Sequence, residues 1–429
     1  MRLSVYNFKS IAEVVDVDIS DLTVLAGVNS SGKSSLIQAI LLLKQTLTTS
    51  KSDLLNIEGP YVYANSIMDL VHNKRNGVMK FVLKLSRAEF SPPEWDSSAI
   101  GEANELSAIE ITVSFSIVGD SCVVSEFKYI RNYGSVSVSE TSLHYRPRKK
   151  VYDYRYDGKL TKDLRLDNYS FANFFPIFAS KDGVTYDFQN IKEARTLLGN
   201  YLEKVVYIAP LRVAPVLSRT YQTDVERRYV LPDGENTRFI LDEISGNQDK
   251  IAMVREWLCD KFQLAKDVNV VKESGKRYRV VVTTAEGLKV DLMHMGFGLS
   301  QILPIITQGC ISVPDSLMIV EDPDVHMHPS IQAAMADFFI CICKEHHVSV
   351  LVETHSDHFI TRLRRRIAEK EISSDKVHLL FVTNGFGDSV YKTIPLLATG
   401  RMTGSMPPGF MDTRDQDFKA ILEANRSKA

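Results

Sequence analysis

The stretch Leu22-Thr23-Val24-Leu25-Ala26-Gly27-Val28-Asn29-Ser30-Ser31-Gly32-Lys33-Ser34-Ser35 joins an apolar run to a glycine-rich loop, and a second apolar run, Ser35–Leu47, follows. Residues Gly27–Ser34 match the pattern G-x-x-x-x-G-K-S, which cradles phosphate when it connects a strand to a helix. The flanking runs predict that context, with a strand over Leu22–Ala26 and a helix over Ser35–Leu47. A glycine-rich turn that binds no nucleotide is the alternative.

The residue types of this loop predict the contacts of a bound nucleotide. Backbone N–H groups and the helix N-terminus would hold the β-phosphate, and Lys33 would reach the β- and γ-phosphates. The Ser34 hydroxyl would be a ligand of Mg²⁺. The full set of predicted cofactor contacts in the loop is Asn29, Ser30, Ser31, Gly32, Lys33, Ser34 and Ser35.

Another apolar run lies far downstream, at Leu317–Val320, and is followed directly by Glu321 and Asp322. Four apolar residues followed by two acids predict carboxylates at the C-terminal end of a strand, where ligands bind in open α/β sheets. We expect Glu321 to hold Mg²⁺, directly or through water, and Asp322 to orient or deprotonate an attacking water. A strand that ends in acids is common by itself, so the prediction depends on its pairing with the loop at Gly27.

Histidines follow two of the predicted strands. The strand Val348–Val352 leads to His355, which would hydrogen-bond the γ-phosphate, although a histidine in a helix-capping turn is the alternative. The pair His326 and His328 suggests a metal site, but no Cys or third His lies near in sequence to complete one. A role linked to the nucleotide or to an interface is therefore favoured for that pair.

The segment Gly296-Phe297-Gly298-Leu299-Ser300-Gln301 precedes an apolar helix predicted over Ile302–Thr307. Its two glycines permit close approach of another backbone, and Ser300 at the helix start offers a hydroxyl and an N–H to an anion. Gly-x-Gly is frequent in turns, so the segment is a weak signal on its own.

The pattern along the chain predicts an α/β fold in four parts. Residues 1–86 form an N-terminal lobe with the phosphate loop, and residues 87–200 form a β-rich insertion with a helical end. Residues 201–295 connect this insertion to residues 296–429, where helices and strands alternate as in βαβ units of a parallel sheet. Within the insertion, Glu110–Ile117 and its neighbours alternate like antiparallel strands, and the tyrosine-rich stretch Tyr152–Tyr156 is interpreted as turns.

The charge, the apolar runs and the cysteines of the chain limit the classes of function that it can have. The net charge of −2 argues against wholesale attraction to nucleic acid, but it allows a local basic groove. Arg146–Lys150 and Arg362–Arg366 are the candidate segments for such a groove, with solvated surface charge as the alternative. No apolar run has the length of a membrane span, and five scattered cysteines favour free thiols, so we expect a cytoplasmic protein.

These segments together resemble the ATP-binding-cassette class of AAA-type ATPases, in the bacterial branch that contains SMC, RecF and OLD-family proteins. Gly27–Ser35 is similar to the Walker A motif, Leu317–Asp322 to the Walker B motif, and His355 to the switch histidine. Gly296–Gln301 is similar to the signature segment, and Glu321–Pro329 resembles the run E-x-P-E-x-H-L-H-P of the OLD-like branch. Shorter segments that are also similar are Asn7-Phe8-Lys9-Ser10, which adds Lys9 to the nucleotide contacts, Pro210-Leu211-Arg212, and Pro408–Asp412.

The resemblance implies an ABC-ATPase head that works as a homodimer or higher homo-oligomer around ATP and Mg²⁺. Gly296, Gly298, Ser300 and Gln301 of one protomer would meet the γ-phosphate bound by Lys33 of the other. Asp322 stands where the usual catalytic residue is Glu, which suggests slow hydrolysis. The best match to the glutamine loop is Asp69–His72.

Two features of these families have no counterpart in the sequence: long coiled-coil arms and a carboxylate-rich Toprim nuclease domain. The chain therefore resembles the ATPase subunits of anti-phage defence systems of the PARIS and Septu kinds, in which the effector is a separate protein. We expect a sensor and scaffold ATPase that controls an effector encoded nearby, a nuclease. The alternatives are a DNA-binding repair or recombination ATPase, and a protein-interaction module whose platform is residues 87–200.

Overall fold

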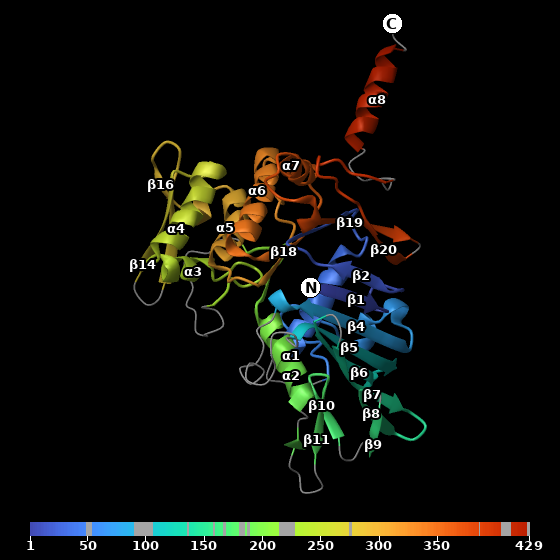
Figure 1. Ribbon diagram of the computed structural model, residues 1–429. Helices are drawn as coiled ribbons and strands as arrows, with labels where there is room; N and C mark the ends of the chain where they lie inside the picture. Colours follow the sequence, from blue (N-terminus) through green and yellow to red (C-terminus); the bar gives the residue numbers. More distant parts are fainter. Residues whose placement is uncertain are drawn as a thin grey trace. The chain divides into compact units, whose positions relative to one another are not determined.

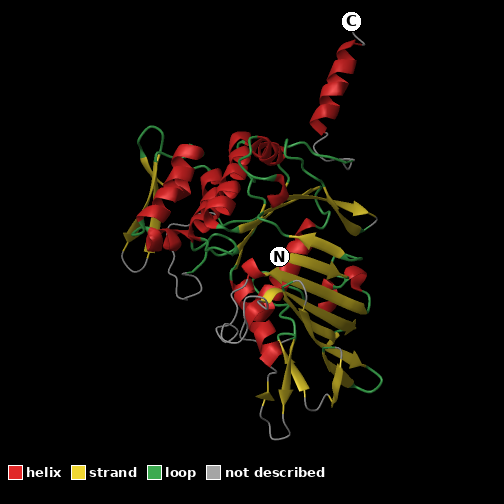
Figure 2. Ribbon diagram, in the orientation of Figure 1, coloured by secondary structure: helices red, strands yellow, loops and turns green. Residues whose placement is uncertain are grey.

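The computed structural model divides into two compact units (Figures 1 and 2). The first comprises Met1–Ile19, Ser34–Val205 and Asn384–Val390, and the second comprises Ser20–Lys33, Val206–Thr383 and Tyr391–Ala429. The structure describes residues 1–48, 54–89, 106–134, 137–157, 159–165, 169–179, 185–186, 189–213, 228–273, 277–385, 387–404 and 413–426. The similarity segment Pro408–Asp412 lies outside these described residues.

An antiparallel sheet of eight strands in the order β2-β1-β4-β5-β6-β7-β8-β9 dominates the first unit. Its strands are β1 (Arg2–Tyr6), β2 (Val15–Asp18), β4 (Gly77–Ser86), β5 (Leu106–Val118), β6 (Ser121–Tyr133), β7 (Ser137–Arg146), β8 (Val151–Tyr156) and β9 (Lys159–Arg165). A smaller sheet contains β10 (Tyr169–Ala172), β11 (Phe175–Ala179) and β12 (Thr185–Tyr186). The predicted antiparallel strands after residue 105 therefore continue the sheet that β1 and β4 begin.

The strand β8 corrects the expectation of turns over Tyr152–Tyr156. Tyr152 pairs with Tyr145 of β7, and its ring is almost fully buried, with 1% of its surface exposed. The hydroxyl of Tyr152 donates to the carbonyl of Val124 at 2.8 Å. Tyrosine is a strong strand former when its ring packs against a core, so a tyrosine-rich run was a strand signal that the turn interpretation missed.

Among its described residues, the first unit contains the helices α1 (Lys33–Thr48) and α2 (Gln189–Glu203), with short helices η1 (Ile67–Leu70), η2 (His72–Lys74) and η3 (Arg87–Glu89). The apolar run of α1 is buried, which explains why a helix with so few polar residues forms here. Tyr129 of β6 donates to the buried carboxylate of Glu193 in α2 at 2.9 Å, so α2 packs on the sheet through a polar contact as well as apolar ones.

The second unit is built on a six-stranded sheet in the order β13-β17-β18-β3-β19-β20. These strands are β3 (Leu22–Gly27), β13 (Val205–Ile208), β17 (Leu317–Glu321), β18 (Ser349–Thr354), β19 (Val377–Gly385) and β20 (Asp388–Thr393). The four neighbouring strands β17, β18, β3 and β19 run parallel. The expected alternation of helices and strands after residue 296 is thus present, and the prediction of an α/β fold with mixed and parallel sheets is confirmed.

Helices of the second unit are α3 (Thr237–Ile244), α4 (Gln248–Arg255), the π-helix η8 (Glu256–Lys261), η9 (Leu292–His294), α5 (Phe297–Ile311), α6 (Pro329–His346), α7 (Asp357–Ala368), η10 (Ser374–Lys376) and α8 (Thr413–Arg426). A three-stranded sheet adds β14 (Asp267–Glu273), β15 (Arg277–Thr283) and β16 (Lys289–Asp291). The last two of these strands pair in antiparallel fashion, with Val282 opposite Val290. No helix among the described residues is long and apolar enough to cross a membrane.

The start of α5 differs from the sequence-based expectation. The helix begins at Phe297 with Gly296 as its N-cap, so Ser300 lies within the first turn and not at the start. Apolar residues Leu299, Ile302 and Leu303 are buried in the core of the second unit, and Leu299 extends that buried face one turn towards the N-terminus. Glycine favours helix ends, and the two glycines concealed how early this helix begins.

Candidate functional site

The register of the parallel strands places the predicted motifs at one edge of the sheet in the second unit. Glu321 at the end of β17 pairs with Glu353 of β18, and Thr354 pairs with Ala26 of β3. The chain therefore leaves β3, β17 and β18 at neighbouring points, into the glycine-rich loop, the Glu321-Asp322 pair and the His355 turn. This is the edge at which open α/β sheets bind ligands.

The loop after β3 has a backbone conformation that its glycines make possible. Ser30 and Gly32 have φ angles of 58° and 97°, in the left-handed region. Alternation of right- and left-handed residues turns successive N–H groups towards one concave face, which is an anion-binding arrangement. A Cβ atom added to Gly27 would lie 2.2 Å from the carbonyl oxygen of Val382 in β19, so no other residue fits there. The hydroxyl of Tyr391 donates to the carbonyl of Gly32 at 2.6 Å and fixes the far end of the loop.

Lys33 is a buried cation at the end of this loop. Its amine donates to the carbonyls of Gly27 and Val28 at 3.2 and 3.0 Å, and it lies 3.7 Å from a carboxylate oxygen of Glu353. Burial lowers the pKa of Lys33, and the nearby carboxylates, Glu353 foremost, oppose that shift. The site therefore contains the partly desolvated ammonium group of Lys33 close to acidic side chains, and this group donates hydrogen bonds to carbonyls of the loop.

The two acids after β17 are held by different groups. The hydroxyl of Tyr207 donates to the Glu321 carboxylate at 2.7 Å, and Glu321 is buried. Asp322 has a φ of 46°, and its N–H donates to the carbonyl of Glu353 at 2.9 Å. The guanidinium of Arg212 donates to the carbonyls of Glu321 and Asp322 at 2.6 and 3.1 Å. The backbone at this strand end is thus held by the Glu353 carbonyl and by the Arg212 guanidinium.

His355 follows β18 directly and lies close enough to Lys33 for the two groups to influence each other. Partial burial and the Lys33 charge lower the pKa of His355, while Asp322 opposes the shift. Nearby, Asp324 accepts a hydrogen bond from Thr354 at 2.7 Å, and burial raises the pKa of Asp324 to about 6. Ser356 caps α7 by accepting from the N–H of Phe359.

The segment Gly296–Gln301 packs against the loop that follows the acids. A Cβ atom on Gly298 would lie 3.4 Å from the carbonyl oxygen of His326, in tight contact. Gln301 is buried, and its amide donates to the carbonyl of Arg212 at 3.3 Å. Ser300 is also buried, whereas Gly296 is exposed at the N-cap of α5.

Other predicted contacts belong to the first unit, where their partners are local. The hydroxyls of Ser35 and Ser10 lie 2.7 Å apart, and Lys9 donates to the side chain of Gln38 at 2.6 Å. Ser34 lies in the first turn of α1. His72, in the segment matched to the glutamine loop, lies with its Nδ1 atom 2.8 Å from the carbonyl of Lys9.

The His326/His328 pair does not form part of a metal cluster among the described residues. His328 is the N-cap of α6, and its side chain accepts from the N–H of Ser330. Pro329 follows at the first helical position, where proline is favoured. The second histidine of the pair therefore has a structural task in starting a helix.

Four residues of the site were given no role in the sequence-based prediction: Tyr207, Glu353, Tyr391 and Arg212, the last of which was noted only within the similar segment Pro210-Leu211-Arg212. Glu353 carried a signal, since it is an acid at the end of a buried strand, as Glu321 is. The other three make contacts across large sequence separations, 109 residues for Arg212 to Glu321. Such contacts leave no periodic pattern from which to predict them.

Comparison with known proteins identifies the family. The profile of the AAA ATPase domain matches residues 1–205 and 217–360, most of the chain. Among curated proteins none matches significantly. Three SMC head structures are similar at low identity. An SmcHead bound to the C-winged helix domain of ScpA has 14% identity, covers 92% of this chain and 97% of its own, and gives a TM-score of 0.48. The SMC head domain from Thermotoga maritima has 12% identity, coverages of 92% and 98%, and a TM-score of 0.41. An Smc head with an extended coiled coil bound to the C-terminal domain of ScpA derived from Pyrococcus furiosus has 12% identity, coverages of 99% and 98%, and a TM-score of 0.43. Each TM-score is below 0.5, so these similarities alone do not establish a common fold. The profile match covers well over half of the sequence, and the chain belongs to the AAA ATPase domain family.

Proposed function

We propose that the protein binds ATP with Mg²⁺ at the loop Gly27–Ser35 and hydrolyses it. The observation that carries this proposal is the position of Lys33, a buried cation at the end of the loop with left-handed Ser30 and Gly32, and 3.7 Å from the strand-end acid Glu353. Glu321 and Asp322 also act on the charge of Lys33 from the neighbouring strand end. A triphosphate would give this ammonium charged acceptors in place of loop carbonyls.

The residues of the loop fit a nucleotide phosphate and its metal ion. The left-handed residues Ser30 and Gly32 shape the N–H groups into a concave face, the arrangement that binds anions. Glu321 and the Ser34 hydroxyl are the oxygen ligands we assign to Mg²⁺, because that ion prefers one or two carboxylates with substrate phosphates. When bound, Mg²⁺ neutralises charge on the β- and γ-phosphates.

The protein side chains have separate tasks in this proposal. Asp322, which has a left-handed backbone directly after the strand, accepts a proton from the attacking water. His355, whose pKa is lowered, stays neutral near neutral pH and donates a hydrogen bond to the γ-phosphate. Lys9, Asn29, Ser31 and Ser35 complete the proposed contacts around the nucleotide.

The direct test is phosphate release from ATP by the purified protein, with and without Mg²⁺. We expect slow, Mg²⁺-dependent release that is lost in the Lys33→Ala variant and unchanged in Lys289→Ala, which removes an exposed lysine of β16. Release that is equal in wild type and Lys33→Ala would come from a contaminant and would refute the proposal.

We further propose that ATP brings two or more copies together, with α5 of one copy facing the nucleotide of another. The exposed N-cap of α5 at Gly296 supports this, because a helix N-terminus favours negative charge. Within each copy Ser300 and Gln301 are buried. For this reason Gly296 and Gly298 are the residues of this segment best placed for backbone contact with a partner's phosphate.

The biological role we propose is that of a sensor and scaffold subunit in bacterial anti-phage defence, which controls a separate effector, a nuclease. Its support is the resemblance of the motifs to ATPase subunits of that kind. The test is a plaque assay with cells that carry the gene and its neighbours. Protection by the wild-type genes should disappear with Lys33→Ala and persist with Lys289→Ala, and undiminished protection with Lys33→Ala would contradict the proposal.

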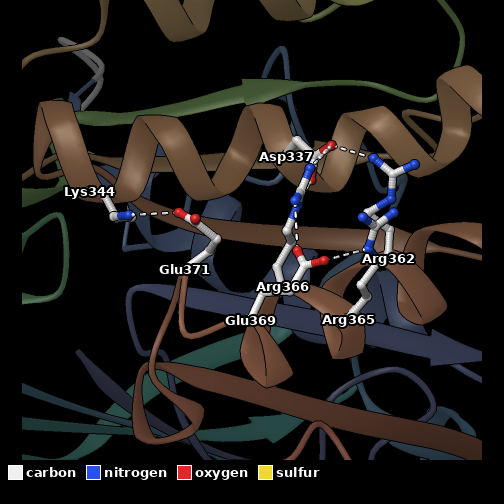
Figure 3. Close-up of polar contacts among 7 residues, drawn as sticks. All are labelled: Asp337, Lys344, Arg362, Arg365, Arg366, Glu369 and Glu371. Atoms are coloured by element: carbon white, nitrogen blue, oxygen red, sulfur yellow. Dashed lines mark hydrogen bonds and ion pairs between the residues drawn. The ribbon is translucent and has the colours of Figure 1, made fainter.

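A DNA-binding repair or recombination ATPase is the second candidate, and one observation favours it. Arg148, Lys149 and Lys150 are exposed at the turn between β7 and β8. In contrast, the arginines of α7 are engaged within the second unit: Arg362 and Arg366 bind Asp337, and Arg365 binds Glu369 (Figure 3). The basic turn is therefore the better candidate for a DNA contact than α7.

The test of this second candidate is binding to duplex DNA at increasing salt. If the turn binds phosphates, replacement of Arg148, Lys149 and Lys150 by Ala should weaken binding and reduce its dependence on salt. Replacement of Arg365 is the matched control on α7. Binding that is absent, or that does not change with salt, would exclude this function.

A further inference from the structure

The segment from β13 to Arg212 lies against the strand end that carries the two acids. Tyr207 is the third residue of β13, which neighbours β17 in the sheet. Its hydroxyl donates to a carboxylate oxygen of Glu321 at 2.7 Å. A phenol hydroxyl donates and an ionised carboxylate only accepts, so Tyr207 is the donor of this hydrogen bond.

Arg212 holds the same strand end through the main chain. One guanidinium nitrogen donates to the carbonyls of both Glu321 and Asp322, and the side chain is 4% exposed. The Nε and Nη1 atoms of Arg212 have no hydrogen-bond partner within the described part of the chain. A buried guanidinium whose bonds go to two consecutive carbonyls restrains the peptide between them. That peptide sets the direction of both acidic side chains.

The same arginine reaches the helix that follows the glycine segment. The carbonyl of Arg212 accepts from the side-chain amide of Gln301 in α5 at 3.3 Å. One residue therefore contacts α5 through its own main chain and the end of β17 through its side chain.

We propose that Tyr207 and Arg212 are positioning residues, a clamp that holds the Glu321 carboxylate and the Asp322 backbone in the arrangement that accepts Mg²⁺ with the nucleotide. The proposal depends on the proposed function, and it deepens it by giving a role to residues outside the glycine-rich loop and the Glu321-Asp322 pair. Neither residue needs to touch the nucleotide. Tyr207 fixes one carboxylate oxygen of Glu321 and thereby restrains the rotation of that carboxylate.

The clamp predicts that its variants lose affinity for Mg²⁺ while they keep their affinity for the nucleotide. Partners that orient a metal ligand typically change metal affinity about tenfold to a hundredfold when removed. In Tyr207→Phe, binding of a fluorescent ATP analogue in EDTA should remain within about twofold of wild type. The Mg²⁺ concentration that gives half of the Mg²⁺-induced increase in binding should rise about tenfold. Arg212→Met should behave in the same way, and Arg212→Lys, which keeps a donor, should recover part of the loss.

The experiment is a titration of Mg²⁺ into protein and the fluorescent ATP analogue, followed by anisotropy, with circular dichroism to check folding. Tyr278→Phe is the matched control, because it removes a hydroxyl from another buried tyrosine of the second unit. An unchanged Mg²⁺ midpoint in Tyr207→Phe would overturn the clamp, as would equal loss of binding in EDTA and in Mg²⁺. If the wild-type protein itself binds no nucleotide, the proposed function fails, and the two failures are thereby distinguished.

Discussion

At the scale of single residues, Asp322 shows how the backbone and the chemistry are connected. Its left-handed φ of 46° is uncommon outside glycine, and asparagine and aspartate tolerate it better than most residues. Asparagine therefore preserves the backbone at this position while it removes the carboxylate that would accept a proton. This makes Asp322→Asn a clean probe of chemistry.

We expect Asp322→Asn to bind ATP as wild type does and to release phosphate at least about a hundredfold more slowly, since a positioned base contributes that much. Single-turnover phosphate release and equilibrium ATP binding measure the two effects. Asp315→Asn is the control, because Asp315 is also left-handed, with a φ of 58°, and is exposed. Loss of ATP binding in Asp322→Asn, or undiminished release, would contradict the role of Asp322 as base.

Lys44 offers a prediction about pH. It is buried in α1, and its amine donates to the carbonyl of Leu202 at 2.8 Å. Burial lowers its pKa to about 8, below the ordinary value of 10.5. Between those two values the unfolded chain holds a proton that the folded chain does not, so the contribution of Lys44 to the free energy of unfolding rises with pH across that window.

The measurement compares the unfolding temperatures of wild type and Lys44→Met at about pH 7.5, below both pKa values, and at about pH 9.5, between them. The unfolding temperature of wild type relative to that of the variant should be higher at the higher pH. Lys289→Met, at an exposed lysine, should show no such movement. A difference that is independent of pH would show that Lys44 keeps its ordinary pKa in the folded chain, and one that moves the other way would show that folding raises this pKa.

At the scale of elements, α6 and α7 illustrate a contact that the sequence suggested in part. The run Arg362–Arg366 was visible, but its interpretation as a nucleic-acid contact missed Asp337 on the preceding helix. The two guanidinium groups of Arg362 and Arg366 converge on that one carboxylate, and Glu369 joins them (Figure 3). Basic residues spaced three or four apart share a helix face, yet the sequence does not say which element covers that face.

We expect Asp337→Asn to lower the free energy of unfolding by about 1–2 kcal/mol, because it weakens two charge-assisted contacts at once. Differential scanning calorimetry of wild type and variant checks this. Asp16→Asn is the control, because Asp16 makes a single exposed ion pair with Arg2, and such pairs contribute little. Equal effects of the two substitutions would show that the Asp337 network adds nothing beyond an ordinary surface pair.

At the scale of the whole molecule, the sequence predicted well where structure is local or periodic. The glycine-rich loop, the acids after Val320 and the alternation of helices and strands from Gly296 were all visible, because each follows from neighbouring residues. It predicted poorly where distant segments meet. In the folded chain β4 and β5 join β1 in one sheet, and Tyr207 and Arg212 contact the end of β17. These contacts depend on the tertiary fold and not on neighbouring residues.

The proposed self-association belongs to this scale. Asp322→Asn should trap ATP-bound assemblies, because it slows hydrolysis while Lys33, the loop and the proposed Mg²⁺ ligand Glu321 remain intact. Size-exclusion chromatography with light scattering should show a larger species for Asp322→Asn with ATP and a smaller one without it. The double variant with Lys33→Ala should remain small under both conditions. A mass that does not respond to ATP in Asp322→Asn would contradict the proposed ATP-dependent assembly.

The central claim, that the loop at Gly27–Ser35 binds ATP through Lys33, is tested most directly by isothermal titration of ATP and Mg²⁺ into the purified protein. The account predicts saturable binding to wild type and to Lys289→Ala, and affinity that is at least about tenfold weaker in Lys33→Ala, as loss of a charge-assisted bond requires. Absence of binding to wild type, or equal affinity in Lys33→Ala, would contradict it.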